Sequence, residues 1–317
     1  RFAIPNLMAG NTVVLKHAGN VSGCSLAISS LFQEAGFYEG CFSSVLLPGK
    51  DTEKLIKDSR IAAVTLTGST GAGKKVAEIS GHYLKKTVLE LGGSDPYLIL
   101  DDADLDKAIP TCVNSRLINN GQSCIAAKRF IVVESRLEEF TERFVEEMKT
   151  KTMGDPMDES FDLGPQARTD LRDELHDQVQ RSIDKGAKCL MGGEIPYKKG
   201  AWYPPTVLTG VEAGMAAYEE ELFGPVAAII KAKDEKDAIR IANDSVFGLG
   251  AAVFTEDVKK GERIAAKELN AGNCFVNSLV KSDPRLPFGG IKESGYGREL
   301  SHFGIKEFVN IKTVYVS

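Results

Sequence analysis

One cysteine and one glutamate stand in surroundings that suit thioester chemistry. Cys124 ends the stretch Asn-Asn-Gly-Gln-Ser-Cys (119–124), a turn expected between a helix and a strand at 127–133. Glu90 interrupts an apolar strand that ends in two glycines, Leu-Glu-Leu-Gly-Gly (89–93). A carboxylate in a hydrophobic strand must be paired, hydrogen-bonded or shifted in pKa. A thiol nucleophile and such a carboxylate are what an enzyme needs to form and hydrolyse a thioester.

The elements that must position these two residues follow an α/β pattern. The first part of the chain alternates short β-branched runs with helical spacing of apolar residues, which predicts a parallel sheet with helices on its faces. The expected strands are 12–16, 42–47 and 61–66, and the expected helices are 22–35 and 52–58. From Pro96 a second α/β pattern begins. Its helix at 135–151 is predicted to start with a capping box, Ser135-x-x-Glu138.

A glycine-rich turn, Thr-Gly-Ser-Thr-Gly-Ala-Gly (67–73), joins the strand at 61–66 to a helix at about 74–82. Such a turn lets backbone N–H groups approach a pyrophosphate at the N-terminus of the helix, where the helix dipole favours anions. The alternative is a tight turn with a Ser or Thr cap, because the sequence is not the Gly-x-Gly-x-x-Gly fingerprint of Rossmann enzymes.

Composition excludes several classes of protein. The 317 residues predict about two domains. A formal net charge of −5 without a Lys/Arg-rich block argues against nucleic-acid binding. No apolar run approaches a membrane span, so we expect no membrane partner. The six cysteines are scattered, which favours reduced thiols in the cytoplasm over a disulfide framework or a metal site.

Four motifs resemble those of the NAD(P)-dependent aldehyde dehydrogenases. They are the cysteine stretch 119–124, the glutamate stretch 89–93, the glycine-rich turn 67–73 and Glu-Leu-Phe-Gly-Pro (221–225). A long glycine-rich loop at 287–299 adds to the likeness, which covers the chain from residue 15 to its end. The resemblance implies that Cys124 attacks an aldehyde, that hydride passes to NAD or NADP, and that Glu90 activates water to hydrolyse the thioester. In the mechanism that the resemblance implies, the backbone N–H of Cys124 can be one donor to the oxyanion.

The resemblance also implies a set of cofactor-binding residues in both parts of the chain. Lys16 matches a lysine that bonds the adenosine ribose. Gly19 stands where many NAD-preferring members carry a glutamate that repels a 2′-phosphate, so both NAD and NADP stay open. Glu221 and Phe223 match residues that hold the nicotinamide ribose and pack near its ring. The remaining cofactor residues come from the glycine-rich turn and the glutamate stretch: Gly68, Ser69, Gly73 and Leu91.

Stretches around residues 16–20, 89–96 and 297–304 resemble one bacterial branch, the succinate-semialdehyde dehydrogenases. For that substrate Arg116 could supply a guanidinium to the distal carboxylate, with a structural ion pair as the alternative. Ser282 matches a serine that bonds the same carboxylate, and Phe288 matches an aromatic residue near the nicotinamide and the aldehyde. Glutarate semialdehyde or another small aldehyde is an alternative substrate.

The resemblance predicts an aldehyde-dehydrogenase-like α/β fold with a Rossmann-type nucleotide-binding domain at 1–92, a catalytic domain at 93–292 and a C-terminal segment at 293–317. Alternating apolar residues at 308–316 predict a terminal strand that pairs across subunits, hence a homo-oligomer, dimer or tetramer. The start of the chain suggests a member truncated at its N-terminus, whose isolated 317 residues are inactive. Two other classes stay open: a cofactor-independent thiol hydrolase, and a non-catalytic relic.

Overall fold

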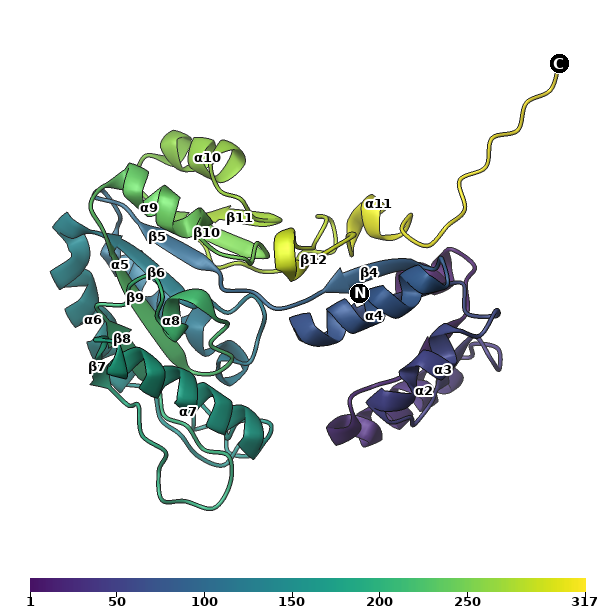
Figure 1. Cartoon of the computed structure of the whole chain (residues 1–317), viewed down its shortest axis with the longest axis horizontal. Helices are drawn as coiled ribbons and strands as arrows, with labels where there is room; N and C mark the ends of the chain where they lie inside the picture. The colour runs from purple at the N-terminus through teal and green to yellow at the C-terminus, as the bar shows by residue number, and fades with distance from the viewer. The chain divides into compact units, whose positions relative to one another are not determined.

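The computed structural model describes all residues from 1 to 317 and divides them between two compact units, shown in Figure 1. Unit 1 consists of residues 1–91, 282–289 and 295–317, and unit 2 of residues 92–281 and 290–294. The domain limits expected from the sequence, at 92 and 292, stay a prediction.

Unit 1 contains two small sheets. Strand β1 (Val13–Leu15) pairs in parallel with β2 (Phe42–Ser44). Strand β4 (Lys86–Glu90) lies between β3 (Ala63–Thr67), which is parallel to it, and β12 (Gly295–Tyr296), which is antiparallel. The expected alternation of strands and helices is confirmed, but its three strands are shared between two sheets. The helices of unit 1 are α1 (Ala3–Met8), α2 (Ser22–Glu34), α3 (Thr52–Ile56), α4 (Thr70–His82) and α11 (Ser301–Gly304).

Unit 2 is built on a seven-stranded sheet in the order β11-β10-β5-β6-β9-β8-β7. Neighbouring strands are parallel except β7 and β8 at one edge. The strands are β5 (Pro96–Ile99), β6 (Arg129–Val133), β7 (Lys188–Met191), β8 (Thr206–Thr209), β9 (Val226–Ala232), β10 (Gly250–Phe254) and β11 (Asn273–Val276). The helices are α5 (Leu105–Leu117), α6 (Leu137–Lys149), α7 (Thr169–Asp184), α8 (Ala216–Glu219), α9 (Glu235–Asn243) and α10 (Val258–Lys267).

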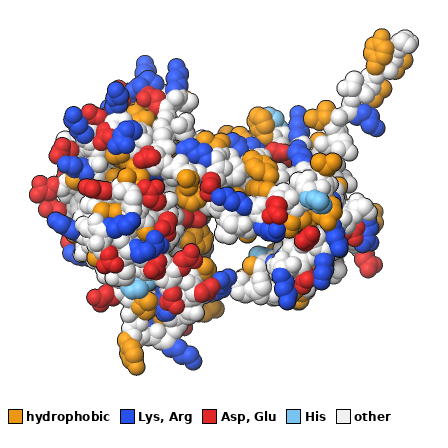
Figure 2. Space-filling view, in the orientation of Figure 1, with side chains coloured by type: hydrophobic (Ala, Val, Ile, Leu, Met, Phe, Trp, Pro, Cys, Tyr) orange, Lys and Arg blue, Asp and Glu red, His pale blue; other side chains and the backbone are white.

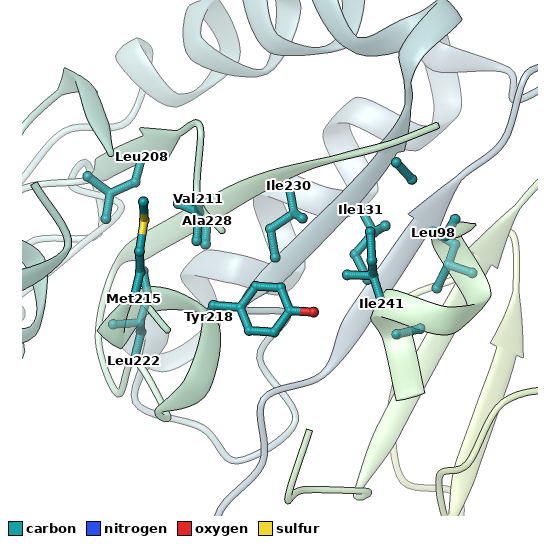
Figure 3. Packing of buried hydrophobic residues seen from close by; sticks show 14 of the residues in the cluster. Leu98, Ile131, Leu208, Val211, Met215, Tyr218, Leu222, Ala228, Ile230 and Ile241 are labelled. Carbon is teal, nitrogen blue, oxygen red and sulfur yellow. The ribbon is translucent and has the colours of Figure 1, made fainter. Parts of the chain in front are cut away.

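The central strands of this sheet are buried on both faces, because helices cover each face of the sheet. Alternate residues of β6 divide between two hydrophobic clusters: Ile131 packs with residues of α7 to α10, and Phe130 with residues of α5 and α6. Figure 3 shows the first cluster, in which Ile230 points toward the ring of Tyr218. Such continuous apolar strands are typical of a parallel sheet between two helical layers. The sheet is therefore a rigid support for the loops at the ends of its strands.

One local prediction is wrong. Ser135 does not cap α6: its hydroxyl donates to the carboxylate of Asp101 instead, and α6 begins after a 3-10 turn without a side-chain cap. Within the single chain, residues 310–317 belong to no helix or strand. The strand expected at 308–316 would pair with another subunit, so it stays a prediction. Its alternating apolar side chains, such as Ile311 and Val314, are largely exposed.

The surface gives two further observations. On the visible face of unit 2, acidic and basic side chains lie intermixed (Figure 2). No helix combines the length and the apolar character needed to cross a lipid bilayer.

Candidate active site

Among the carboxyl groups of unit 1, Glu90 has the largest shift in pKa. It is the last residue of β4, between β3 and β12, and is only 3% exposed. Neither of its carboxylate oxygens has a hydrogen-bond partner. Burial, together with the negative charge of Glu299, raises the pKa of Glu90 to about 8, while Arg1 and Arg298 oppose the shift. A carboxyl group tuned to this range can take up and release a proton near neutral pH.

The glycine-rich turn lies next to Glu90 within unit 1. The Gly68 N–H donates to the Glu90 carbonyl over 3.0 Å. Ser69 caps helix α4, its hydroxyl accepting the Ala72 N–H over 3.3 Å. Gly73 is buried in α4 against the buried side chain of Leu91, which would clash with any Cβ at this position. The expected Gly68, Ser69, Gly73 and Leu91 are thus brought together at the start of one helix.

Lys16 and Gly19 follow strand β1, at the end where its chain leaves the sheet. Lys16 is half-buried, and Gly19 opens a short 3-10 turn with no atom within 4 Å of an ideal Cβ. A side chain larger than glycine would therefore find open space there.

The expected substrate residues of unit 1 differ in their surroundings. Phe288 is 2% exposed, and the Arg1 guanidinium lies 4.3 Å from the centre of its ring. Its backbone exchanges two hydrogen bonds with Glu299, of 2.7 and 2.8 Å. Since Glu299 is the residue whose charge raises the pKa of Glu90, Phe288 belongs to the same cluster of groups. Ser282 is half-buried.

In unit 2, Cys124 lies half-buried in the turn between α5 and β6. Three successive residues before it adopt the left-handed region: Asn119 (φ 51°), Asn120 (φ 57°) and Gly121 (φ 74°). Asparagine and glycine are the residues that tolerate this conformation. An ideal Cβ on Gly121 would lie 2.2 Å from the carbonyl oxygen of Gly224, so only glycine fits. The turn is therefore closely fitted against the 221–225 segment.

Arg116 is fully buried near the end of α5. Its guanidinium donates to the carbonyl of Gly121 over 2.8 Å and to that of Val226 over 3.2 Å. Both contacts join the cysteine turn to the segment that follows Phe223. They favour a structural role over a contact with substrate, and they differ from the ion pair weighed as the alternative, because both partners are backbone oxygens.

Glu221 and Phe223 belong to the segment 221–225, which packs against the cysteine turn where Gly224 meets Gly121. The Gly93 N–H donates to Glu221 Oε1 over 2.9 Å, and Lys128 Nζ lies 3.5 Å from that oxygen. Phe223 is half-buried. Unit 2 thus gathers Cys124, Arg116, Glu221 and Phe223, whereas unit 1 gathers Glu90, Phe288 and the glycine-rich turn.

Sequence reasoning missed Lys128. This side chain is fully buried, and its ammonium donates to the carbonyls of Ser123 and Cys124, each over 2.8 Å. The signal was present: Lys128 and Arg129 are two cations at the start of an apolar strand, and buried charges require partners.

Comparison with known proteins decides the family. The profile of the aldehyde dehydrogenase family matches residues 1–314. The chain belongs to the aldehyde dehydrogenase family. The family and the enzyme class expected from the four motifs are therefore confirmed, as is the α/β fold.

Individual aldehyde dehydrogenases resemble the chain over nearly all of its length. An Escherichia coli succinate semialdehyde dehydrogenase [NAD(P)+] is 51% identical over 315 residues, which are 99% of this chain and 68% of that protein. A Mycobacterium avium succinate-semialdehyde dehydrogenase [NADP(+)] is 48% identical over 316 residues, covering 100% of this chain and 67% of that protein. The solved succinic semialdehyde dehydrogenase from Streptococcus pyogenes, in complex with NADP+, superposes with a TM-score of 0.96 at 40% identity, covering 99% of this chain and 69% of the other.

Proposed function

We propose that the protein oxidises succinate semialdehyde to succinate with NAD or NADP, through a thioester on Cys124. The buried, unbonded carboxyl group of Glu90 carries the chemical part of this proposal, because its raised pKa suits a general base. The substrate follows from the relatives, since the E. coli and M. avium proteins described above are both named for succinate semialdehyde.

The proposed reaction has two halves. In the first, the Cys124 thiolate adds to the aldehyde carbon, and the resulting oxyanion accepts a hydrogen bond from the Cys124 backbone N–H. NAD or NADP, when bound, would supply the hydride acceptor for this oxidation, and Cys124 would then carry the acyl group as a thioester. In the second half, Glu90 takes a proton from water as that water attacks the thioester carbon. The acid is released, and the thiolate of Cys124 is restored.

The residues of unit 1 fit a dinucleotide phosphate. Helix α4 has 13 residues, and its first turn follows the Gly68-Ser69 pair. Its N-terminal N–H groups and dipole favour an anion. No acidic side chain occupies position 19, where a carboxylate would repel a 2′-phosphate. We therefore propose that both NAD and NADP are accepted, with Lys16 at the ribose and Glu221 and Phe223 at the nicotinamide end.

For the substrate, we propose that Ser282 and Phe288 contact the aldehyde and its distal carboxylate. Arg116 stays a candidate, although its guanidinium donates to backbone carbonyls. Arg116→Ala separates the roles: an unchanged KM for succinate semialdehyde with a lowered Tm would assign Arg116 to the support of the cysteine turn.

The assay is formation of reduced cofactor from succinate semialdehyde, with NAD and NADP in parallel and acetaldehyde as a second substrate. It is made on the 317-residue chain alone and on that chain joined to the part of the E. coli relative that lies outside the match. Turnover with succinate semialdehyde in either form supports the proposal. Turnover with acetaldehyde alone would remove the substrate assignment, and no turnover with either would remove the dehydrogenase proposal. Cys124→Ala must abolish any activity.

A homo-oligomer and a cytoplasmic location stay proposals. The exposed alternating side chains of residues 308–316 and six cysteines without a disulfide are the observations that support them.

A further inference from the structure

The buried ammonium of Lys128 has contacts that none of the roles above uses. Its side chain is fully buried at the start of β6, and its backbone is fixed in the sheet of unit 2. The Lys128 N–H donates to the Asp95 carbonyl over 3.2 Å, and its own carbonyl accepts the Ala228 N–H over 3.0 Å. The position of the ammonium therefore depends on the rigid sheet, and not on a surface loop.

The ammonium has three N–H groups and three acceptors nearby. Two are the carbonyl oxygens of Ser123 and Cys124, each 2.8 Å from Nζ. The third is Glu221 Oε1, at 3.5 Å. Taking a charge out of water is costly unless it is paired and hydrogen-bonded. Lys128 directs both of its short bonds to two successive carbonyls at the proposed nucleophile.

One of these bonds fixes a peptide group that the proposed reaction needs. A peptide unit is planar, and all peptide bonds of the chain are trans. The Ser123 carbonyl and the Cys124 N–H belong to the same unit and point in opposite directions. An ammonium that holds this carbonyl therefore also sets the direction of the Cys124 N–H. A charged donor on the carbonyl also polarises the unit, which strengthens its N–H as a donor.

We propose that Lys128 is a positioning residue for the oxyanion: by holding the Ser123 carbonyl, it aims the Cys124 N–H at the oxygen that becomes negative when Cys124 attacks a carbonyl carbon. The inference rests on the proposed role of Cys124 and extends it to a residue that does not touch the substrate.

Burial and the negative charges that face the ammonium act on its pKa in opposite directions. Burial lowers the pKa of Lys128, and the nearby Arg116 acts in the same direction. Glu221, the strongest opposing group, raises it, and Asp95 and Cys124 do so as well. The carboxylate of Glu221 is itself held by the Gly93 N–H, so it stays beside the lysine.

The test compares two reactions of Cys124 that differ only in the need for an oxyanion. Attack on p-nitrophenyl acetate forms a C–S bond through a tetrahedral oxyanion, releases p-nitrophenolate and leaves an acetyl thioester. Attack on iodoacetamide forms a C–S bond by direct displacement of iodide, without an oxyanion. Both need the same thiolate and neither needs a cofactor or an aldehyde. The ratio of the two rates therefore isolates support of the oxyanion.

For Lys128→Met we expect acylation to slow by about 10- to 100-fold. This is less than the roughly 10²- to 10³-fold loss on removal of one oxyanion donor, because the Cys124 N–H remains and only its direction is lost. Alkylation of Cys124 should fall much less than acylation, because displacement of iodide needs the thiolate but no oxyanion donor. Lys128→Arg, which keeps a charged donor, should acylate faster than Lys128→Met. Cys124→Ala should lose both acylation and alkylation at position 124, which assigns both reactions to this thiol. If Lys128→Met lacks a cooperative unfolding transition, Lys128→Gln replaces it, and the same fall in the ratio of acylation rate to alkylation rate is expected.

The matched control is Arg129→Met. Arg129 is an equally buried neighbour, and its guanidinium donates to the carbonyls of Ser94, Ile241 and Ala242, away from Cys124. This variant should lower Tm and keep the ratio of the wild type. A proportional loss of both reactions in Lys128→Met, an unchanged acylation rate, or an equal change of the ratio in Arg129→Met would overturn the proposal. Absence of aldehyde oxidation in the wild type would refute the proposed function and leave the ratio test intact.

Discussion

The raised pKa of Glu90 predicts how the hydrolytic half of the reaction depends on pH. With a pKa of about 8, roughly a tenth of the Glu90 carboxyl groups are ionised at pH 7 and roughly nine-tenths at pH 9. Only the ionised form can take a proton from water. If hydrolysis of the thioester limits turnover, the rate should therefore rise about tenfold from pH 7 to pH 9, with its midpoint near pH 8.

The assay follows release of acetate from the acetyl thioester on Cys124 between pH 6 and pH 10. Glu90→Gln should lower this rate by about 10²- to 10⁴-fold and remove the midpoint, because the amide cannot act as a base. Glu299→Gln should move the midpoint to lower pH, since the charge of Glu299 raises the pKa of Glu90. Glu134→Gln, at an exposed pair with Lys231, is the control and should leave the midpoint unchanged. A flat profile in the wild type, or the same midpoint in Glu90→Gln, would refute the reasoning.

Three further predictions concern stability and thiol reactivity. In urea titrations the free energy of unfolding should fall as pH rises from about 4.5 to about 8, by up to about 1.4 kcal/mol per pH unit. The reason is that Glu90 is ionised only in the unfolded chain over that range. The same dependence on pH in Glu90→Gln would contradict this. Gly121→Ala should lower the free energy of unfolding by at least about 1–3 kcal/mol, because its φ is 74° and a Cβ meets a backbone oxygen at 2.2 Å. Gly71→Ala, which meets nothing within 4 Å in helix α4, should cost no stability, and equal losses would refute the steric argument. Mass spectrometry after limited iodoacetamide treatment should find Cys124 labelled before Cys112, whose thiol is fully buried and has its pKa raised by that burial; the reverse order would be evidence against a reactive Cys124.

The parts of the fold predicted correctly are those where local pattern and burial agree. A carboxylate in the stretch 89–93 is expected in an apolar strand, and Glu90 ends β4 and is buried. Ser69, after a strand and before a helical pattern, caps α4. In both cases neighbours in sequence determine the local structure.

The failures come from side-chain contacts that the sequence pattern does not show. Ser135 has the spacing of a helix cap, but Asp101, 34 residues earlier, takes its hydroxyl. Lys128 was overlooked although the carbonyls of Ser123 and Cys124 are only five and four residues before it, because the direction of these carbonyls depends on how the cysteine turn folds. Residue types alone do not show such contacts.

The pairing of β4 with β12 also orders events during synthesis. Glu90 pairs with Gly295, about 200 residues further along the chain. At about 5–20 residues per second, a ribosome adds that many residues in roughly 10–40 s. Until then the nascent segment that ends in Glu90 has β3 on one side and no β12 on the other, and the Glu299 charge that raises its pKa has not been made. A nascent chain held by a chaperone over this interval should therefore carry an ionised Glu90, and the proposed base acquires its raised pKa only after residues 295–299 have been added.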